Sequence, residues 1–223
     1  MRIVVRSISF AVVLLLCSSI ARAQISVTYA QDGEKLPADV FAASVRVTND
    51  VGNARVQGSG TCVWTCGDHT LVLSCGHGWT SSGAFHVSAD YPDRAAYEAT
   101  LLARDTARDT SAFLISGTRP LVPVLDGDVT IGEPGSAVGY PHGEGPRAWF
   151  VTINRGRSGR YVGPWIGTSL TATHGHSGGG AFVKRDSEWR LAGITSTTET
   201  LADPASVRLC LDRAFEKLRD WSC

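Results

Sequence analysis

The chain has 223 residues, of which 43% are hydrophobic and 19% charged, and its 21 basic and 21 acidic side chains give a formal net charge of zero at pH 7. This balance, without any run of Lys or Arg, argues against nucleic acid as a partner. The length fits one large domain or two small ones, and no repeat or low-complexity segment interrupts it.

The first 23 residues have the pattern of a secretory signal peptide. Arg2 and Arg6 precede an apolar run at residues 8–16, and Ala21-Arg22-Ala23 forms a small-x-small cleavage site. The run is too short to cross a bilayer, and we expect no transmembrane segment later in the chain. We therefore expect cleavage after Ala23 and a secreted or periplasmic protein. Lipidation at Cys17 is the alternative, which the bulky Leu16 before it disfavours.

After the signal, the chain reads as a series of short strands joined by Gly, Asn, Asp and Pro turns. A proline-punctuated connector at residues 119–123 divides the series in two. Strands at such short spacing predict all-β barrels or sandwiches. The predicted strands are 44–47, 54–64, 71–77, 84–88, 97–103 and 111–115 before the connector, and 136–139, 149–154, 169–173, 181–184 and 189–196 after it.

Only the C-terminus has the pattern of a good helix, predicted at about residues 206–220. Asp203 and Pro204 supply a cap and a first-turn proline. An apolar face recurs along the helix and should dock on a barrel. Its members are Val207, Leu211, Ala214, Phe215 and Leu218.

Five of the six cysteines lie after the signal, in an exported chain that permits disulfides. If the hairpin at 54–77 folds about its middle, Cys62 and Cys75 come close across its strands and form the predicted disulfide. Cys210 and Cys223 would be held too far apart by a continuous helix to pair. The spacing of Cys62, Cys66 and Cys75 also resembles a zinc cluster, but it lacks a fourth ligand and we expect no metal.

Ser177 lies in the glycine-rich stretch 175–180 and is the candidate nucleophile. A serine nucleophile needs a base, a group that orients the base, and donors for the oxyanion. The stretch also matches the Gly-x-Ser-x-Gly elbow of esterases and lipases, which requires a histidine after the serine. No histidine follows Ser177. The order base, acid, serine remains, with His77 as base and Asp109, preferred over Asp105, as acid.

Four segments in this order resemble those of trypsin-like serine proteases. Residues 71–77 resemble the strand that ends in the catalytic histidine, and 105–115 the acid-bearing segment of bacterial Deg-type and trypsin-2-like peptidase domains. Residues 132–141 resemble the first strand of the second barrel, and 175–180 the serine motif. The resemblance implies an all-β, double six-stranded β-barrel with a C-terminal α-helix and without a PDZ domain. The expected halves are residues 24–118 and 119–223.

The resemblance implies a serine endopeptidase in which a triad of His77, Asp109 and Ser177 hydrolyses peptide bonds through an acyl-enzyme. The backbone N–H groups of Gly175 and Ser177 would meet the oxyanion. The expected partner is a protein or peptide substrate, and we expect a monomer without a cofactor or metal.

Substrate-binding positions follow from their distance along the chain from Ser177. Thr171 should lie near the base of the primary pocket, and Ser196, Thr197 and Thr198 should pair with the substrate backbone. None of these side chains is charged, so we expect a preference for small or medium uncharged substrate residues.

A catalytically inactive binding or adhesion protein on the same fold is the alternative function. In its favour, His176 stands where the family usually has Asp or Asn before the serine, and Gly78 replaces the cysteine after the histidine. Against it, His77, Asp109 and Ser177 are all present. The intact set favours an active enzyme.

Overall fold

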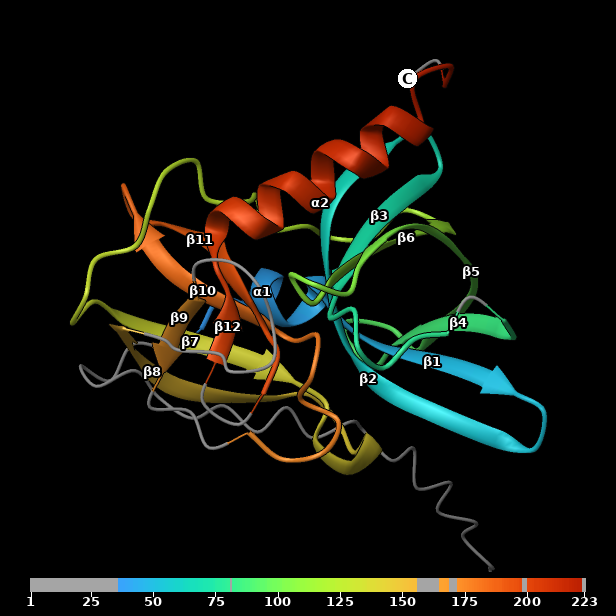
Figure 1. Ribbon diagram of the computed structural model, residues 1–223, viewed down its shortest axis with the longest axis horizontal. Helices are drawn as coiled ribbons and strands as arrows, with labels where there is room; N and C mark the ends of the chain where they lie inside the picture. The colour runs from blue at the N-terminus through green and yellow to red at the C-terminus, as the bar shows by residue number, and fades with distance from the viewer. Residues whose placement is uncertain (1–35, 81, 156–164, 169–171, 198–199, 222–223) are drawn as a thin grey trace, which may run out of the picture.

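The described residues form twelve strands that close into two six-stranded barrels, with a helix lying across both (Figure 1). The computed structural model describes residues 36–80, 82–155, 165–168, 172–197 and 200–221, so the predicted signal peptide lies outside the described residues. Within these ranges, no helix has the length and apolar character needed to span a membrane. The predicted all-β double barrel with a C-terminal helix is confirmed.

The first barrel has the strand order β1-β2-β3-β6-β5-β4, with every neighbouring pair antiparallel. Its core follows the period of two expected for a strand: in β1, Val45 and Val47 are buried while Arg46 and Thr48 are half-exposed. The strands are β1 Ser44–Val51, β2 Ala54–Cys66, β3 His69–Ser74, β4 Ala84–Ala89, β5 Ala95–Asp105 and β6 Thr110–Ser116.

The second barrel has the order β10-β11-β12-β9-β8-β7. The connector bonds to both barrels through its backbone: the Val122 amide donates to the Cys62 carbonyl of the first at 3.0 Å, and the Pro123 carbonyl accepts the Leu191 amide of the second at 2.9 Å. The strands are β7 Pro134–Gly139, β8 Arg147–Arg155, β9 Trp165–Thr168, β10 Gly180–Arg185, β11 Glu188–Thr195 and β12 Thr200–Ala202, with a 3-10 turn, η1, at Pro141–Gly143.

Helix α2, Pro204–Lys217, runs from the second barrel to the first (Figure 1). Asp203 caps it, because its Oδ1 accepts a hydrogen bond from the Ser206 amide at 2.9 Å. The predicted apolar face docks as expected: Val207, Ala214 and Leu218 are buried, and the other two members pack beside them. The helix contacts β5, β6 and β11, so it bridges the two barrels.

Several short elements differ from the sequence predictions. The strand predicted at 169–173 is wrong in position: β9 ends at Thr168, residues 172–173 lie outside any strand, and 169–171 lie outside the described residues. Helix α1, Ala38–Ala43, and strand β12 were not predicted. Both are too short to display a period, and α1 follows Pro37 without a side-chain cap.

The predicted disulfide between Cys62 and Cys75 is wrong, because both thiols are free and buried. In the β2–β3 ladder Cys62 lies opposite Val72, whereas Cys75 lies beyond the end of β3. The sequence alone does not reveal this register. Burial raises the pKa of Cys62 to about 12, which keeps this thiol protonated and unreactive.

Replacement of the helix cap tests the link between α2 and the barrels. We expect Asp203→Ala to lower the free energy of unfolding by about 1 kcal/mol, because the Ser206 amide loses its acceptor. Asp212→Ala, in the exposed middle of the same helix, is the matched control and should change stability little. Urea unfolding followed by circular dichroism measures both, and equal effects would contradict the capping role.

Candidate active site

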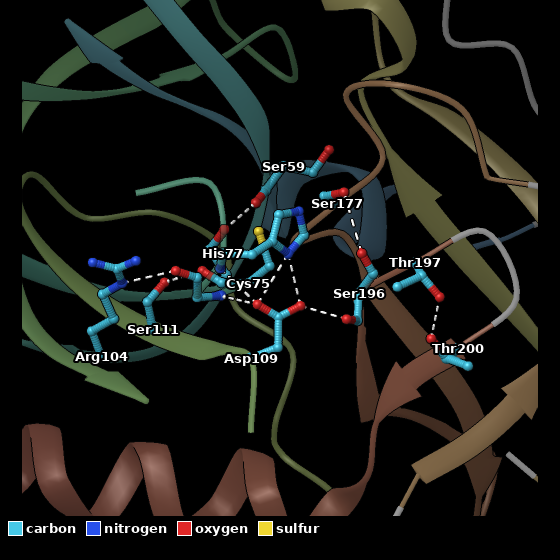
Figure 2. Close-up of polar contacts among 12 residues, drawn as sticks. Ser59, Cys75, His77, Arg104, Asp109, Ser111, Ser177, Ser196, Thr197 and Thr200 are labelled. Atoms are coloured by element: carbon cyan, nitrogen blue, oxygen red, sulfur yellow. Dashed lines mark hydrogen bonds and ion pairs between the residues drawn. The ribbon is translucent and has the colours of Figure 1, made fainter. Parts of the chain in front are cut away.

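His77 and Ser177 line one cavity of about 280 Å³. His77 follows strand β3 of the first barrel, and Ser177 lies in the loop before β10 of the second. Figure 2 shows Asp109 and Ser177 on different sides of the His77 ring. The structure therefore brings together the three residues chosen from the sequence. The described lining of the cavity comprises His77, Ala172, Thr173, His174, Ser177 and Thr197.

The Asp109 carboxylate is fully buried and has four donors. Its Oδ1 accepts the Gly76 amide at 2.9 Å and the His77 amide at 2.6 Å. Both oxygens contact the His77 ring at Nδ1, at 3.0 and 2.8 Å, and Oδ2 also accepts the Ser196 hydroxyl. A buried carboxylate is tolerated only when it is paired and hydrogen-bonded, and these donors meet that requirement.

Asp109 fixes the tautomer of His77. A carboxylate can only accept, so Nδ1 carries the proton and Nε2 presents a lone pair in neutral imidazole. The hydrogen bond to Asp109, followed by the nearby Cys75, raises the pKa of His77 despite partial burial. The His77 side chain is 27% exposed, so the ring can reach a ligand in the cavity.

The Ser177 hydroxyl is available for chemistry. Its hydrogen bond to the Ser196 carbonyl is long, at 3.5 Å. In the described part of the chain, no hydrogen bond takes up the N–H groups of Gly175 and Ser177, the two predicted oxyanion donors. Two unoccupied amides beside a serine can receive the oxygen of a polarised carbonyl.

Positive φ angles at two glycines give the Ser177 loop its shape. Gly175 has φ +93° and Gly178 has φ +88°. A Cβ at Gly175 would lie 2.2 Å from the Tyr140 carbonyl oxygen, and one at Gly178 would lie 2.1 Å from the Ser59 carbonyl oxygen. Both the conformation and the close packing therefore require glycine.

Ser59 of strand β2 fastens this loop to the first barrel, a role the sequence analysis missed. Its amide donates to the Ser177 carbonyl at 2.7 Å, and its hydroxyl donates to the Gly175 carbonyl at 2.6 Å. The same hydroxyl accepts the Tyr140 amide of the second barrel at 2.8 Å. The small-residue run Gly58-Ser59-Gly60 was the available signal, because small residues in a strand often mark close backbone approach.

His176, the unusual residue before the serine, also holds the loop. It is buried, and its Nδ1 accepts the Thr173 amide at 2.8 Å. The ring packs edge-on against Trp149, with centroids 4.0 Å apart. Burial lowers the pKa of His176, so the ring is neutral at pH 7. Neutral imidazole thus supplies the acceptor that shapes the turn before Ser177.

The predicted substrate-binding residues have different surroundings. Thr197 lines the cavity, whereas the Ser196 side chain is buried and donates to Asp109 instead (Figure 2). The hydroxyl role of Ser196 was missed, because nothing in the local sequence relates it to a carboxylate in the other barrel. Thr171 and Thr198 lie outside the described residues.

Comparisons with known proteins agree with this architecture. Residues 58–194 match the family model described as a trypsin-like peptidase domain. A serine endoprotease from Yersinia pestis is similar in structure, with a TM-score of 0.64 and 21% identity over 83% of this chain and 68% of that one. A Mycobacterium tuberculosis protein, solved in an inactive serine-to-alanine form, gives 0.65 and 17% over 80% and 90%. Comparison with curated proteins gives no match.

Acidification tests the role of His176. An unperturbed histidine titrates near pH 6.5, and the folded value is lower, so the unfolded state binds more protons below that pH. The free energy of unfolding should therefore fall as the pH drops below about 6.5. His176→Asn, whose side-chain oxygen can also accept from Thr173, should weaken this dependence.

Urea unfolding at several pH values measures the effect. The exposed neighbour His174→Asn is the control and should keep the wild-type dependence. Identical pH dependence in wild type and His176→Asn would contradict the neutral acceptor role.

Proposed function

This chain belongs to the trypsin-like peptidase family, and from that premise we propose that it is a serine endopeptidase with His77, Asp109 and Ser177 as its catalytic triad. The observation that carries the proposal is the buried Asp109 carboxylate bound to His77 Nδ1, with Ser177 in the same cavity as the ring. An esterase of the nucleophile-elbow type does not fit this all-β fold.

In the proposed reaction, His77 Nε2 takes the proton of the Ser177 hydroxyl as its oxygen attacks the carbonyl carbon of the substrate. The negative charge that develops on the carbonyl oxygen is stabilised by the amides of Gly175 and Ser177. His77 then returns the proton to the departing amine, and the acyl-enzyme forms. Water, deprotonated by the same imidazole, releases the acid product and regenerates the serine.

Asp109 has an orienting and electrostatic role in this scheme. Its negative charge stabilises the imidazolium that forms on His77, and its hydrogen bond keeps Nε2 directed toward the serine. Ser196 supports the same carboxylate from the second barrel. The neutral acceptor at His176 is compatible with activity, because the amides of Gly175 and Ser177 have no hydrogen-bond partner in the part of the chain that the structure describes.

We also propose the substrate and the compartment. The cavity is open enough for a side chain of a protein or peptide, and Thr197 is at its wall. Thr171 and Thr198 are proposed to complete the uncharged binding positions, together with the backbone of Ser196. The predicted signal peptide supports a secreted or periplasmic location, with a monomer acting without a cofactor.

Labelling with a fluorophosphonate probe tests the nucleophile. We expect the folded wild-type protein to be labelled and Ser177→Ala to remain unlabelled, because the probe forms its bond only with an activated serine. Ser116→Ala, exposed at the end of β6, is the matched control and should label like wild type.

A folded wild-type protein that resists labelling would favour the inactive binding protein. Labelling that persists in Ser177→Ala would show that another residue is the nucleophile. Digestion of casein, by wild type but not by Ser177→Ala, then distinguishes peptidase from esterase activity.

The pH profile tests the pairing of His77 with Asp109. The general base must be neutral, and its pKa is raised, so kcat/KM should increase with pH through neutrality into the alkaline range. Asp109→Asn removes the charge that raises this pKa, so the increase should begin at lower pH, with kcat reduced by about 10⁴-fold. Hydrolysis of a chromogenic peptide between about pH 6 and pH 10 measures both effects. An unchanged midpoint in Asp109→Asn would contradict the pairing.

A further inference from the structure

Asp105, four residues before Asp109, shapes the turn that carries the buried acid. Its Oδ1 accepts the Ala107 amide at 3.0 Å and the Arg108 amide at 2.9 Å. These bonds close the tight connection between β5 and β6, where Asp105 lies opposite Thr110 in the ladder. The proposed triad contains only Asp109, so the second carboxylate of this segment has no role in it.

The other oxygen of Asp105 receives two guanidinium groups. Arg108 Nη1 lies 3.1 Å from Oδ2, and Arg213 Nη1, from helix α2, lies 2.6 Å from it. The Asp105 side chain is only 9% exposed. Burial acts to raise the pKa of Asp105, but the hydrogen bonds from Arg108 and Arg213 lower it on balance, so the carboxylate is charged at neutral pH.

The turn has to hold Asp109 in a conformation that non-glycine residues adopt reluctantly. Asp109 has φ +52° and is fully buried. The same end of β5 also contacts the segment between β3 and His77, because Arg104 Nε donates to the Gly76 carbonyl at 2.8 Å. Movement of this turn would therefore change the position of the acid relative to the imidazole.

We propose that Asp105 and Arg213 are positioning residues, through which helix α2 holds the Asp109 carboxylate in register with the His77 ring. The expected effect on catalysis rests on the proposed triad, whereas the expected effect on the position of Asp109 does not. Helix α2 packs on β5 and β6, so Arg213 connects a rigid element to the turn. The pair acts on Asp109 through the backbone and touches neither substrate nor the reacting atoms.

The test compares Arg213→Ala with Arg208→Ala in the full chain. Arg208 is on the same helix but donates to the carbonyls of Leu125 and Gly127, away from the Asp105 turn. Both variants lose a helix contact and should lower the melting temperature by a similar small amount. Only Arg213→Ala should change the position of the Asp109 carboxylate relative to the His77 ring.

Two readouts report on the site. The first is the titration of His77 followed by NMR, which needs no turnover, with Asp109 and Cys75 as the ionisable neighbours that act on the ring. The ionisable groups that act on Asp105 are Arg108 and Arg213, and the pKa of the neighbouring Cys210 is raised by burial and also by Asp105. We expect Arg213→Ala and Asp105→Asn to lower the His77 titration midpoint, because the acid is less well held, and Arg208→Ala to leave it unchanged.

The second readout is kcat/KM on a chromogenic peptide. We expect a loss of roughly tenfold in kcat, with little change in KM, for Arg213→Ala and Asp105→Asn. Arg213→Lys, which keeps the charge, should recover part of the loss. Arg208→Ala should retain wild-type turnover.

The outcomes separate the two proposals. Equal His77 titration in Arg213→Ala and Arg208→Ala, with both variants folded, would overturn the positioning role. A His77 titration that shifts in Arg213→Ala would support positioning even if the wild-type protein neither hydrolyses peptides nor labels at Ser177. That second result would overturn the proposed peptidase. If Arg213→Ala does not fold, the same comparison is made with Asp105→Asn, for which an unshifted titration and full turnover would overturn the role.

Discussion

The burial of one carboxylate is the constraint on which the rest of the site depends. Asp109 is removed from water and keeps its charge only if hydrogen bonds replace its hydration. The first barrel supplies the amides of Gly76 and His77 and the imidazole, and the second barrel supplies the hydroxyl of Ser196. The carboxylate is therefore satisfied only where the barrels meet, beside the cavity that His77 and Ser177 line.

His176 supports the serine loop in a different way from the Asp or Asn that the family usually has at this position. An acid at this position would offer a charge for a cationic partner, whereas His176 is neutral and accepts a backbone amide within its own loop. Within the second barrel, the loop is thus supported by an imidazole acceptor, an edge-on aromatic contact and two glycines with positive φ, in addition to its bonds to Ser59 of the first barrel. Among the described residues, no hydrogen bond occupies the amides of Gly175 and Ser177.

The sequence predicted features that depend on interactions between residues close in the chain, and missed those that depend on distant residues. Period-two patterns and turn residues identified most strands, and Asp203 identified the start of α2, because these signals are local. His77, Asp109 and Ser177 were chosen from motifs and chain order, and the structure brings them together. The failed Cys62–Cys75 pair depended on strand register, which no local signal fixes. Ser59 and the hydroxyl of Ser196 act across the barrel interface, and their partners are far away in the chain.

The bonds of Ser59 have a consequence for when the serine loop can exist. The carbonyls of Gly175 and Ser177 and the amide of Tyr140 all find their partner in this one residue of the first barrel. In an isolated C-terminal half these three backbone groups would have to bond to water, and the loop would lose its main attachments. Assembly of the nucleophile loop is thus a product of barrel docking. A partly folded chain therefore carries the residues of the site but not its geometry.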